Sequence, residues 1–154
     1  MLFHNLQGKS FENVSVVEGT GLAAVIAGRG MAVGDLFNDG KIDSVINVMD
    51  GHPVLLRNVD SNRNHWIELK LTGSGKTPRD ATGTVVYVTA GGIKQRGDVI
   101  SGGSYLSNND PRLHFGVGAA TKIEDVEIQW PDGKIEHAPS PAIDHITPLT
   151  ESAK

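Results

Sequence analysis

The 154-residue sequence contains no cysteine, which excludes a disulfide framework, a thiolate metal site and a thiol nucleophile. No apolar run approaches the ~20 residues that a membrane-spanning helix needs, so we expect no membrane insertion. Lysines and arginines are scattered singly along a chain of formal net charge −4. Because nucleic-acid binding needs a basic face for the phosphates, we expect none here.

Helical periodicity is nearly absent, whereas 19 glycines and 7 prolines indicate many turns between short elements. Ile67, Leu69 and Leu71 alternate with Glu68 and Lys70, which is the pattern of a half-buried strand. Similar runs recur at roughly ten-residue spacing. We therefore predict an all-β protein with strands near residues 31–34, 43–48, 53–58, 65–72, 84–90, 93–100, 112–116, 123–130 and 133–137.

The polar stretch 60–64 marks the predicted boundary between two domains. Residues 1–62 have room for a single propeller-blade-like β-hairpin unit, because a blade takes about 40–45 residues. Residues 63–137 are expected to form an antiparallel β-sandwich-like domain on which this unit packs. Residues 138–154 are expected to be a proline-containing C-terminal tail.

A loop with three aspartates is the strongest candidate site. Asp35, Asp39 and Asp43 occupy relative positions 1, 5 and 9, and Gly40 at position 6 permits a sharp turn. Calcium requires about six to eight oxygen ligands, which a loop supplies only if it wraps around the ion. We expect the three carboxylates to be joined by the main-chain carbonyl of Lys41. The alternative is an Asn-Asp-Gly hairpin turn with solvated acids.

Four further residues are secondary candidates for metal binding. Asp60 and Asn62 have the spacing of oxygen ligands but lack the following glycine, so a linker is the alternative. Asn109 and Asp110 could form a ligand pair, and an Asx-turn before Pro111 is the alternative.

The sequence does not support an enzymatic site. A segment resembling a phosphate-binding loop, 73–77, lacks the first glycine of that motif, because Lys70 stands there. Glu127 and Asp125 could pair as glycosidase acids, although solvated edge charges explain them more simply. A sugar-stacking platform of Trp66, Tyr105 and Trp130 is an alternative to burial of these aromatics in the core.

The aspartate loop resembles the FG-GAP (VCBS) repeat, whose pattern D-x-[DN]-x-D-G-x-x-D is matched by Asp35, Asp39, Gly40 and Asp43, while Phe37 departs from it. This resemblance implies a calcium loop, and the departure at Phe37 implies a weaker site. The second half resembles the ASPIC/UnbV domain, which follows such repeats in secreted proteins. That resemblance is carried by residues 64–67 (NHWI), 79–83 (RDATG), 102–107 (GGSYLS), 110–116 (DPRLHFG) and 128–133 (IQWPDG).

Together these patterns predict a non-enzymatic, calcium-binding structural module of an extracellular or cell-surface assembly. An isolated blade would leave unpaired strand edges, which favour pairing between chains. We therefore expect self-association, head to tail, into a homo-oligomer or fibre through strand edges or termini. The alternative is an accessory module of a larger secreted protein that binds a glycan or an extracellular protein.

Overall fold

The computed structural model describes residues 2–6, 8–15 and 21–153. Every regular element in these residues is a strand, which confirms the all-β prediction, and they include no helix that could span a membrane. The strands are β1 (Phe3–Asn5), β2 (Phe11–Asn13), β3 (Gly28–Gly34), β4 (Asp43–Val48), β5 (Val54–Leu56), β6 (His65–Thr72), β7 (Val85–Ala90), β8 (Ile93–Asp98), β9 (Leu113–Gly118), β10 (Asp125–Gln129), β11 (Ile135–His137) and β12 (His145–Thr150).

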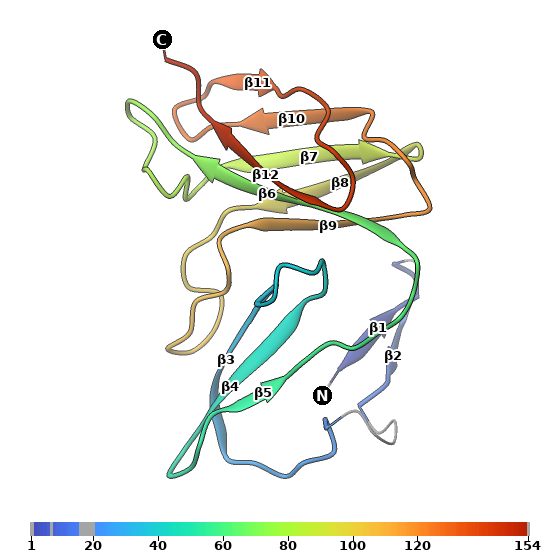
Figure 1. Cartoon of the computed structure of the whole chain (residues 1–154). Coiled ribbons are helices and arrows are strands. Elements are labelled where there is room, and N and C mark those ends of the chain that lie inside the picture. Colours follow the sequence, from blue (N-terminus) through green and yellow to red (C-terminus); the bar gives the residue numbers. More distant parts are fainter. Residues whose placement is uncertain (1, 7, 16–20, 154) are drawn as a thin grey trace.

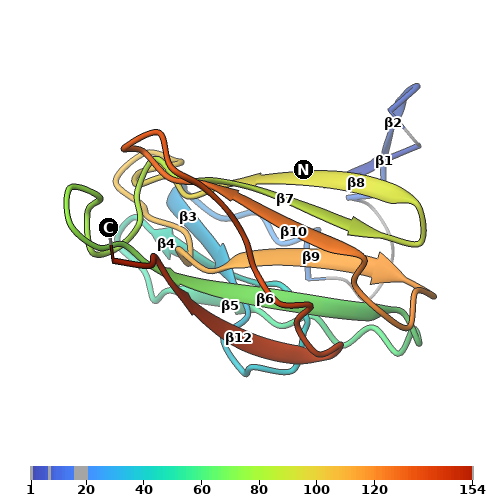
Figure 2. The ribbon, with the colours of Figure 1, turned by 90° about the horizontal axis from the view of Figure 1, so that it is seen from above.

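Two facing sheets form the sandwich-like part of the molecule. One sheet has the strand order β11-β10-β7-β8 and the other has the order β12-β6-β9 (Figures 1 and 2). All neighbours in the first sheet are antiparallel, and β6 is antiparallel to β9. The prediction of an antiparallel sandwich-like domain is confirmed for these strands.

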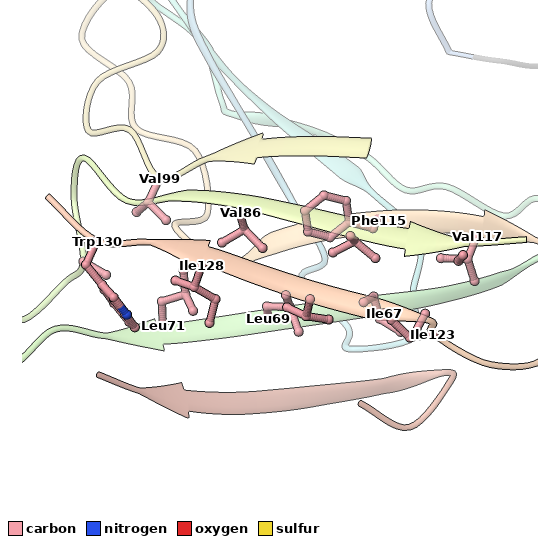
Figure 3. Close-up of a cluster of buried hydrophobic side chains, with 14 residues drawn as sticks. Ile67, Leu69, Leu71, Val86, Val99, Phe115, Val117, Ile123, Ile128 and Trp130 are labelled. Carbon is pink, nitrogen blue, oxygen red and sulfur yellow. The ribbon is translucent and has the colours of Figure 1, made fainter. Parts of the chain in front are cut away.

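The core lies between the two sheets (Figure 3). Ile67 and Leu69 on β6 face Val86 on β7 and Ile128 on β10, and each of these side chains is at most 2% exposed. Burying an aliphatic side chain of this size contributes about 1.5–3 kcal/mol. The two-residue alternation in the sequence therefore produces this core directly, because alternate strand residues point to opposite faces.

The C-terminal segment corrects our prediction of a tail at 138–154. Strand β12 pairs in parallel with β6, in register from His145↔Ile67 to Thr150↔Thr72. Pro148 obscured this strand in the sequence, but proline is tolerated on an edge strand, where one side of the backbone needs no ladder partner. Three partly buried residues of the segment, Ala138, Ile143 and Leu149, pack against the core.

The first part of the chain forms a separate antiparallel sheet, β3-β4-β5, and the small hairpin β1-β2. All nine predicted strands are present, those at 43–48 and 65–72 with the predicted bounds and the others with shifts at their ends, whereas β1, β2 and β12 were not predicted. Figure 1 shows the three-stranded sheet lying below the sandwich, on the side of β6 and β9. The loop between β3 and β4, which carries the aspartates, points toward the sandwich.

Candidate functional site

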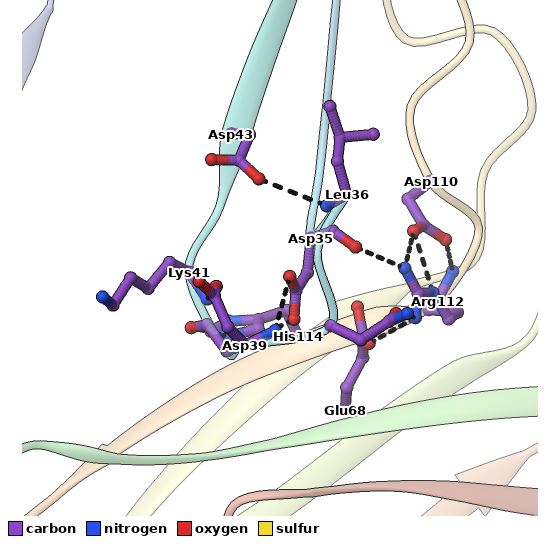
Figure 4. Close-up of polar contacts among 11 residues, drawn as sticks. Asp35, Leu36, Asp39, Lys41, Asp43, Glu68, Asp110, Arg112 and His114 are labelled. Atoms are coloured by element: carbon purple, nitrogen blue, oxygen red, sulfur yellow. Dashed lines mark hydrogen bonds and ion pairs between the residues drawn. The ribbon is translucent and has the colours of Figure 1, made fainter. Parts of the chain in front are cut away.

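The candidate site lies where the aspartate loop meets the outer face of β6 and β9 (Figure 4). Ile67 and Phe115 point into the core, so Trp66, Glu68 and His114 point to the opposite face, toward the loop. Glu68 and His114 are direct neighbours across the β6–β9 ladder. The same strand alternation therefore builds the core on one side and the site on the other.

Asp35 closes the aspartate loop through its own side chain. Its Oδ1 accepts a hydrogen bond from the Asp39 N–H at 3.0 Å, and its Oδ2 accepts one from the Gly40 N–H at 2.7 Å. Gly40 has φ +80°, and a Cβ at this position would lie 2.0 Å from the Trp66 Nε1. Glycine is required here both for the turn and for the contact with the indole.

Asp43, at the start of β4, is only 1% exposed and ties together two segments. Its Oδ1 accepts a hydrogen bond from the Asn58 N–H at 2.8 Å, and its Oδ2 accepts one from the Leu36 N–H at 3.3 Å. Through these two hydrogen bonds Asp43 joins the aspartate loop to the segment that follows β5.

Asp39 is more exposed and faces a cation. Its Oδ1 accepts a hydrogen bond from the Lys41 N–H at 3.2 Å, and its Oδ2 lies 3.6 Å from Arg57 Nη2. The same guanidinium lies 4.1 Å from the centre of the Phe37 ring. Phe37, which departs from the calcium-loop pattern, therefore holds Arg57 beside Asp39 by a cation–π contact.

The three predicted metal ligands thus share one loop but turn toward different donors. Among residues 2–6, 8–15 and 21–153 no group of three or more histidine, aspartate or glutamate side chains is placed to hold a metal ion. The participation of Asp35, Asp39, Asp43 and the Lys41 carbonyl in calcium binding stays a prediction.

The secondary candidates lie in two different places. Asp60 and Asn62 belong to an exposed linker in which the Asn62 N–H donates to Asp60 Oδ1 at 3.2 Å, and the Asn62 side chain lowers the pKa of Asp60. Asn109 accepts a hydrogen bond from the Val33 N–H at 3.0 Å, and the Asp110 N–H donates to the Val33 carbonyl at 3.0 Å. The first pair shapes the linker, and the second joins the β8–β9 loop to β3.

Arg112 is the residue that connects the parts of this site, and our sequence reasoning assigned it no role. Its Nη1 lies 2.9 Å from Glu68 Oε2 and donates to Asn38 Oδ1 at 2.7 Å. Its Nη2 donates to the Asp35 carbonyl at 2.8 Å, and its Nε donates to Asp110 Oδ2 at 2.8 Å. One guanidinium, whose side chain is 18% exposed, therefore joins β6, the aspartate loop and the β8–β9 loop.

Burial sets the electrostatics of the Glu68–Arg112 pair. Desolvation raises the pKa of Glu68 to about 7, Arg112 opposes this rise, and the nearby carboxylates Asp110 and Asp35 add to it. The Glu68 Oε2 is close enough to Arg112 for an ion pair but is not aligned for a hydrogen bond. The pKa of Asp110 is lowered, since hydrogen bonds from Arg112 outweigh the effect of its burial.

His114 completes the contact between the loop and the sandwich. Its Nε2 lies 2.9 Å from the Gly40 carbonyl, so this nitrogen carries the proton and donates it. Its ring stacks on Trp66 with centroids 5.9 Å apart and planes 10° apart. Arg112 and His114 belong to the segment 110–116, which carries part of the family resemblance and was the sequence signal that could have indicated them. Their positions in the sequence do not reveal which residues they contact.

The other functional alternatives from the sequence are not assembled in the structure. Trp130 is 3% exposed and Tyr105 is 67% exposed, so these residues and Trp66 form no common platform. Glu127 pairs with Lys94, whereas Asp125 pairs with His137. These two acids therefore have separate partners at the sheet surface.

Comparisons with known proteins support the second of the two resemblances. The family model described as ASPIC and UnbV matches residues 73–154. Cartilage acidic protein 1 from Xenopus tropicalis and from Homo sapiens are each 33% identical over 113 residues, which cover 70% of this chain. The matched regions are 17% and 16% of those two proteins, so the chain spans about a sixth of their length.

Proposed function

This chain belongs to the ASPIC and UnbV family, and we propose that it is a non-catalytic structural module in which Arg112 clamps a small β sheet onto the family's sandwich. The proposal includes an extracellular or cell-surface location, which is supported by the similarity to proteins named for cartilage. In such a module the relative placement of the two parts is itself the function, because it sets the geometry of a longer protein.

The observation that carries this proposal is the set of partners of Arg112. The guanidinium binds a strand of the sandwich through Glu68, the aspartate loop through Asn38 and the Asp35 carbonyl, and the β8–β9 loop through Asp110. Arginine suits this role because its planar fork presents five donors in fixed directions. Removing it would leave the buried Glu68 and the partly buried Asp110 without their cation, which is costly.

Contacts around the clamp support a rigid junction. His114 binds the Gly40 carbonyl, Trp66 packs against the Gly40 backbone, and Asn109 binds β3. These contacts come from β6, β9 and the loop before β9, so the three-stranded sheet is held at several points. The acidic side chains of the aspartate loop accept backbone N–H groups, which suits a structural role.

Calcium binding by the same loop is a second proposal. Asp35 and Asp43 are 0% and 1% exposed, and neither forms a direct ion pair with a cation in the residues that the structure describes. Buried anions of this kind gain from a nearby cation. Asp35, Asp39, Asp43 and the Lys41 carbonyl would supply the oxygen ligands, and the ion would compete with Arg57 for Asp39.

Self-association is the third part of the proposal and is favoured by the β1-β2 hairpin. All six of its strand residues are exposed, and Phe3 and Phe11 are 53% and 68% exposed. A lone two-stranded hairpin is marginally stable in water, so a second copy that covers it would stabilise it. Electron microscopy for long particles, with and without a chelator, tests this part.

Limited proteolysis tests the clamp itself. Trypsin can cleave after Arg57 and Arg63, which flank the exposed linker between the two parts. We expect R112Q to accelerate cleavage there, because the two parts separate more often. R96Q should not, since in the part of the chain that the structure describes Arg96 forms an ion pair with Asp98 alone, on the surface of β8. Equal cleavage rates in wild type and R112Q would contradict the proposed clamp.

A further inference from the structure

An open depression of about 850 Å³ lies beside the clamp on the outer face of β6. Residues 70–72 of β6 form its floor, Arg79 and Asp80 form one wall, and residues 110–112 form the other. Its volume is within the range of about 300–1,000 Å³ that is typical of small-molecule sites. The lining carries three cationic and two acidic side chains, so it is net positive in a chain of net charge −4.

The acidic side chains of the depression are already occupied. Asp110 accepts hydrogen bonds from Arg112, and Asp80 Oδ1 accepts one from the Thr82 N–H at 3.2 Å. Lys70 and Arg79 are exposed, and their side chains form no hydrogen bond or ion pair with any described residue, although Lys70 is within electrostatic range of Asp110. The positive charge left for a ligand is therefore concentrated on Lys70 and Arg79.

The backbone around Arg79 is held in place before any ligand arrives. The Gly73 N–H donates to the Arg79 carbonyl at 3.2 Å, and the Ser74 N–H donates to Oε2 of the buried Glu151 at 2.8 Å. A Cβ on Gly73 would lie 2.1 Å from the Pro78 carbonyl, so the loop folds tightly on itself. Such preorganisation lowers the entropic cost of binding.

The position of the floor limits what can bind. Strand β12 pairs with β6 as far as Thr72, whereas the register of β9 with β6 ends at Leu69. Only residues 70–72 therefore have an edge that β9 does not cover, which is too short for a peptide to add as a strand of usual length. Leu71, the leucine of the lining, is 7% exposed and belongs to the core, so the floor offers no large apolar anchor for an amphipathic helix. A ligand must therefore be recognised through the charged side chains and the shape of the depression.

We propose that this depression binds an acidic saccharide, whose carboxylate or sulfate groups contact Lys70 and Arg79. Arginine binds such planar or tetrahedral oxyanions through two parallel N–H groups, and lysine adds a mobile point charge. The open shape admits a chain of sugar rings, which needs no deep apolar pocket. The ligand contacts assigned here are those of Lys70 and Arg79, so variants of these two residues test the inference separately from the Arg112 clamp.

Isothermal titration calorimetry with the full chain tests the inference. The probes are a heparin-derived hexasaccharide, an oligogalacturonate of the same length, a neutral maltohexaose and a hexaglutamate peptide. We expect one or both acidic saccharides to bind, with an affinity that falls as salt rises, and the neutral saccharide not to bind. K70A and R79A should each weaken binding by about tenfold, because each removes a charge-assisted contact.

Lys76 provides the matched control, since it is exposed in the same loop but does not line the depression. K76A should leave the dissociation constant within about twofold of wild type, because a lone surface charge outside the site contributes little. The exposed positions of Lys70 and Arg79 predict normal folding of both variants, which a thermal melt checks. The inference is overturned if neither acidic saccharide binds, if K76A weakens binding as much as R79A, or if only the glutamate peptide binds.

Discussion

Arg112 Nη1 lies 2.9 Å from Oε2 of Glu68, a carboxylate that is 1% exposed on the side of β6 facing away from the core. Most of the polar contacts between the aspartate loop and the sandwich surround this pair. The buried Glu68 of the sandwich therefore depends on Arg112, which also binds the aspartate loop of the β3-β4-β5 sheet. Docking of that sheet onto the sandwich is thus coupled to the pairing of Glu68.

We predict that at pH 8.5, where Glu68 is ionised, R112M costs about 3–5 kcal/mol of unfolding free energy, the usual cost of removing one partner from a buried ion pair. The double variant R112M/E68M should lose less than the sum of the two single losses, because it leaves no buried charge unpaired. Urea unfolding followed by tryptophan fluorescence measures all three. R96M is the matched control and should be neutral, since Arg96 and Asp98 are exposed. Additive losses would show that Glu68 and Arg112 are not coupled.

The pH dependence of stability should report on Glu68. Its folded-state pKa is raised from 4.5 to about 7, so between these values the folded state keeps a proton that the unfolded state has lost. This contribution is fully present below pH 4.5 and is lost as pH rises through 7. The difference of the two pKa values corresponds to roughly 3–4 kcal/mol. Urea unfolding of wild type and E68Q at several pH values should show this loss of unfolding free energy in wild type only. The same dependence of unfolding free energy on pH in both proteins would contradict the prediction.

Gly40→Ala should destabilise the protein much more than Gly75→Ala. Both glycines have positive φ, +80° and +60°, and this alone costs alanine about 1 kcal/mol. At Gly40 the added Cβ would also lie 2.0 Å from Trp66 Nε1, whereas at Gly75 nothing lies within 4 Å. We therefore expect the free energy of unfolding to fall by more than about 3 kcal/mol for G40A only. Similar melting temperatures for the two variants would place the loop away from Trp66.

The calcium proposal has a spectroscopic test that uses the contact between Gly40 and Trp66. Terbium, a luminescent stand-in for calcium, should show emission on tryptophan excitation if it enters the aspartate loop. The emission should be displaced by calcium and be absent in D35N and W66F. W130F is the control, because Trp130 lies in the core. Failure of calcium to displace the emission or to raise the melting temperature would exclude the ion from this loop.

Leu149→Ala should lower the unfolding free energy by about 1–2 kcal/mol, less than at a fully buried site because Leu149 is only partly buried. Thr150→Ala, one residue further along β12, changes an exposed side chain and should have an effect within about 0.5 kcal/mol. Thermal unfolding compares the two. Equal changes in unfolding free energy for the two variants would favour the prediction that residues 138–154 form a tail.

The strands were predictable wherever one face is buried, because alternation in β6, β7 and β10 records which side chains point inward. Strand β12 was not, since Pro148 interrupts its pattern and its parallel pairing with β6 follows no short turn. The aspartate loop was recognisable from the spacing of Asp35 and Gly40. Its attachment through Arg112 was not, because that contact crosses 77 residues of sequence and depends on how the two parts meet.

Whether Arg112 holds the two parts in one arrangement can be measured directly by electron–electron resonance between spin labels. The chain has no native cysteine, so L55C on β5 and K122C before β10 place one exposed label on each part. We predict a single narrow distance distribution in the wild-type background and a broad one when R112Q is added. An equally narrow distribution in both would show that the arrangement does not depend on Arg112.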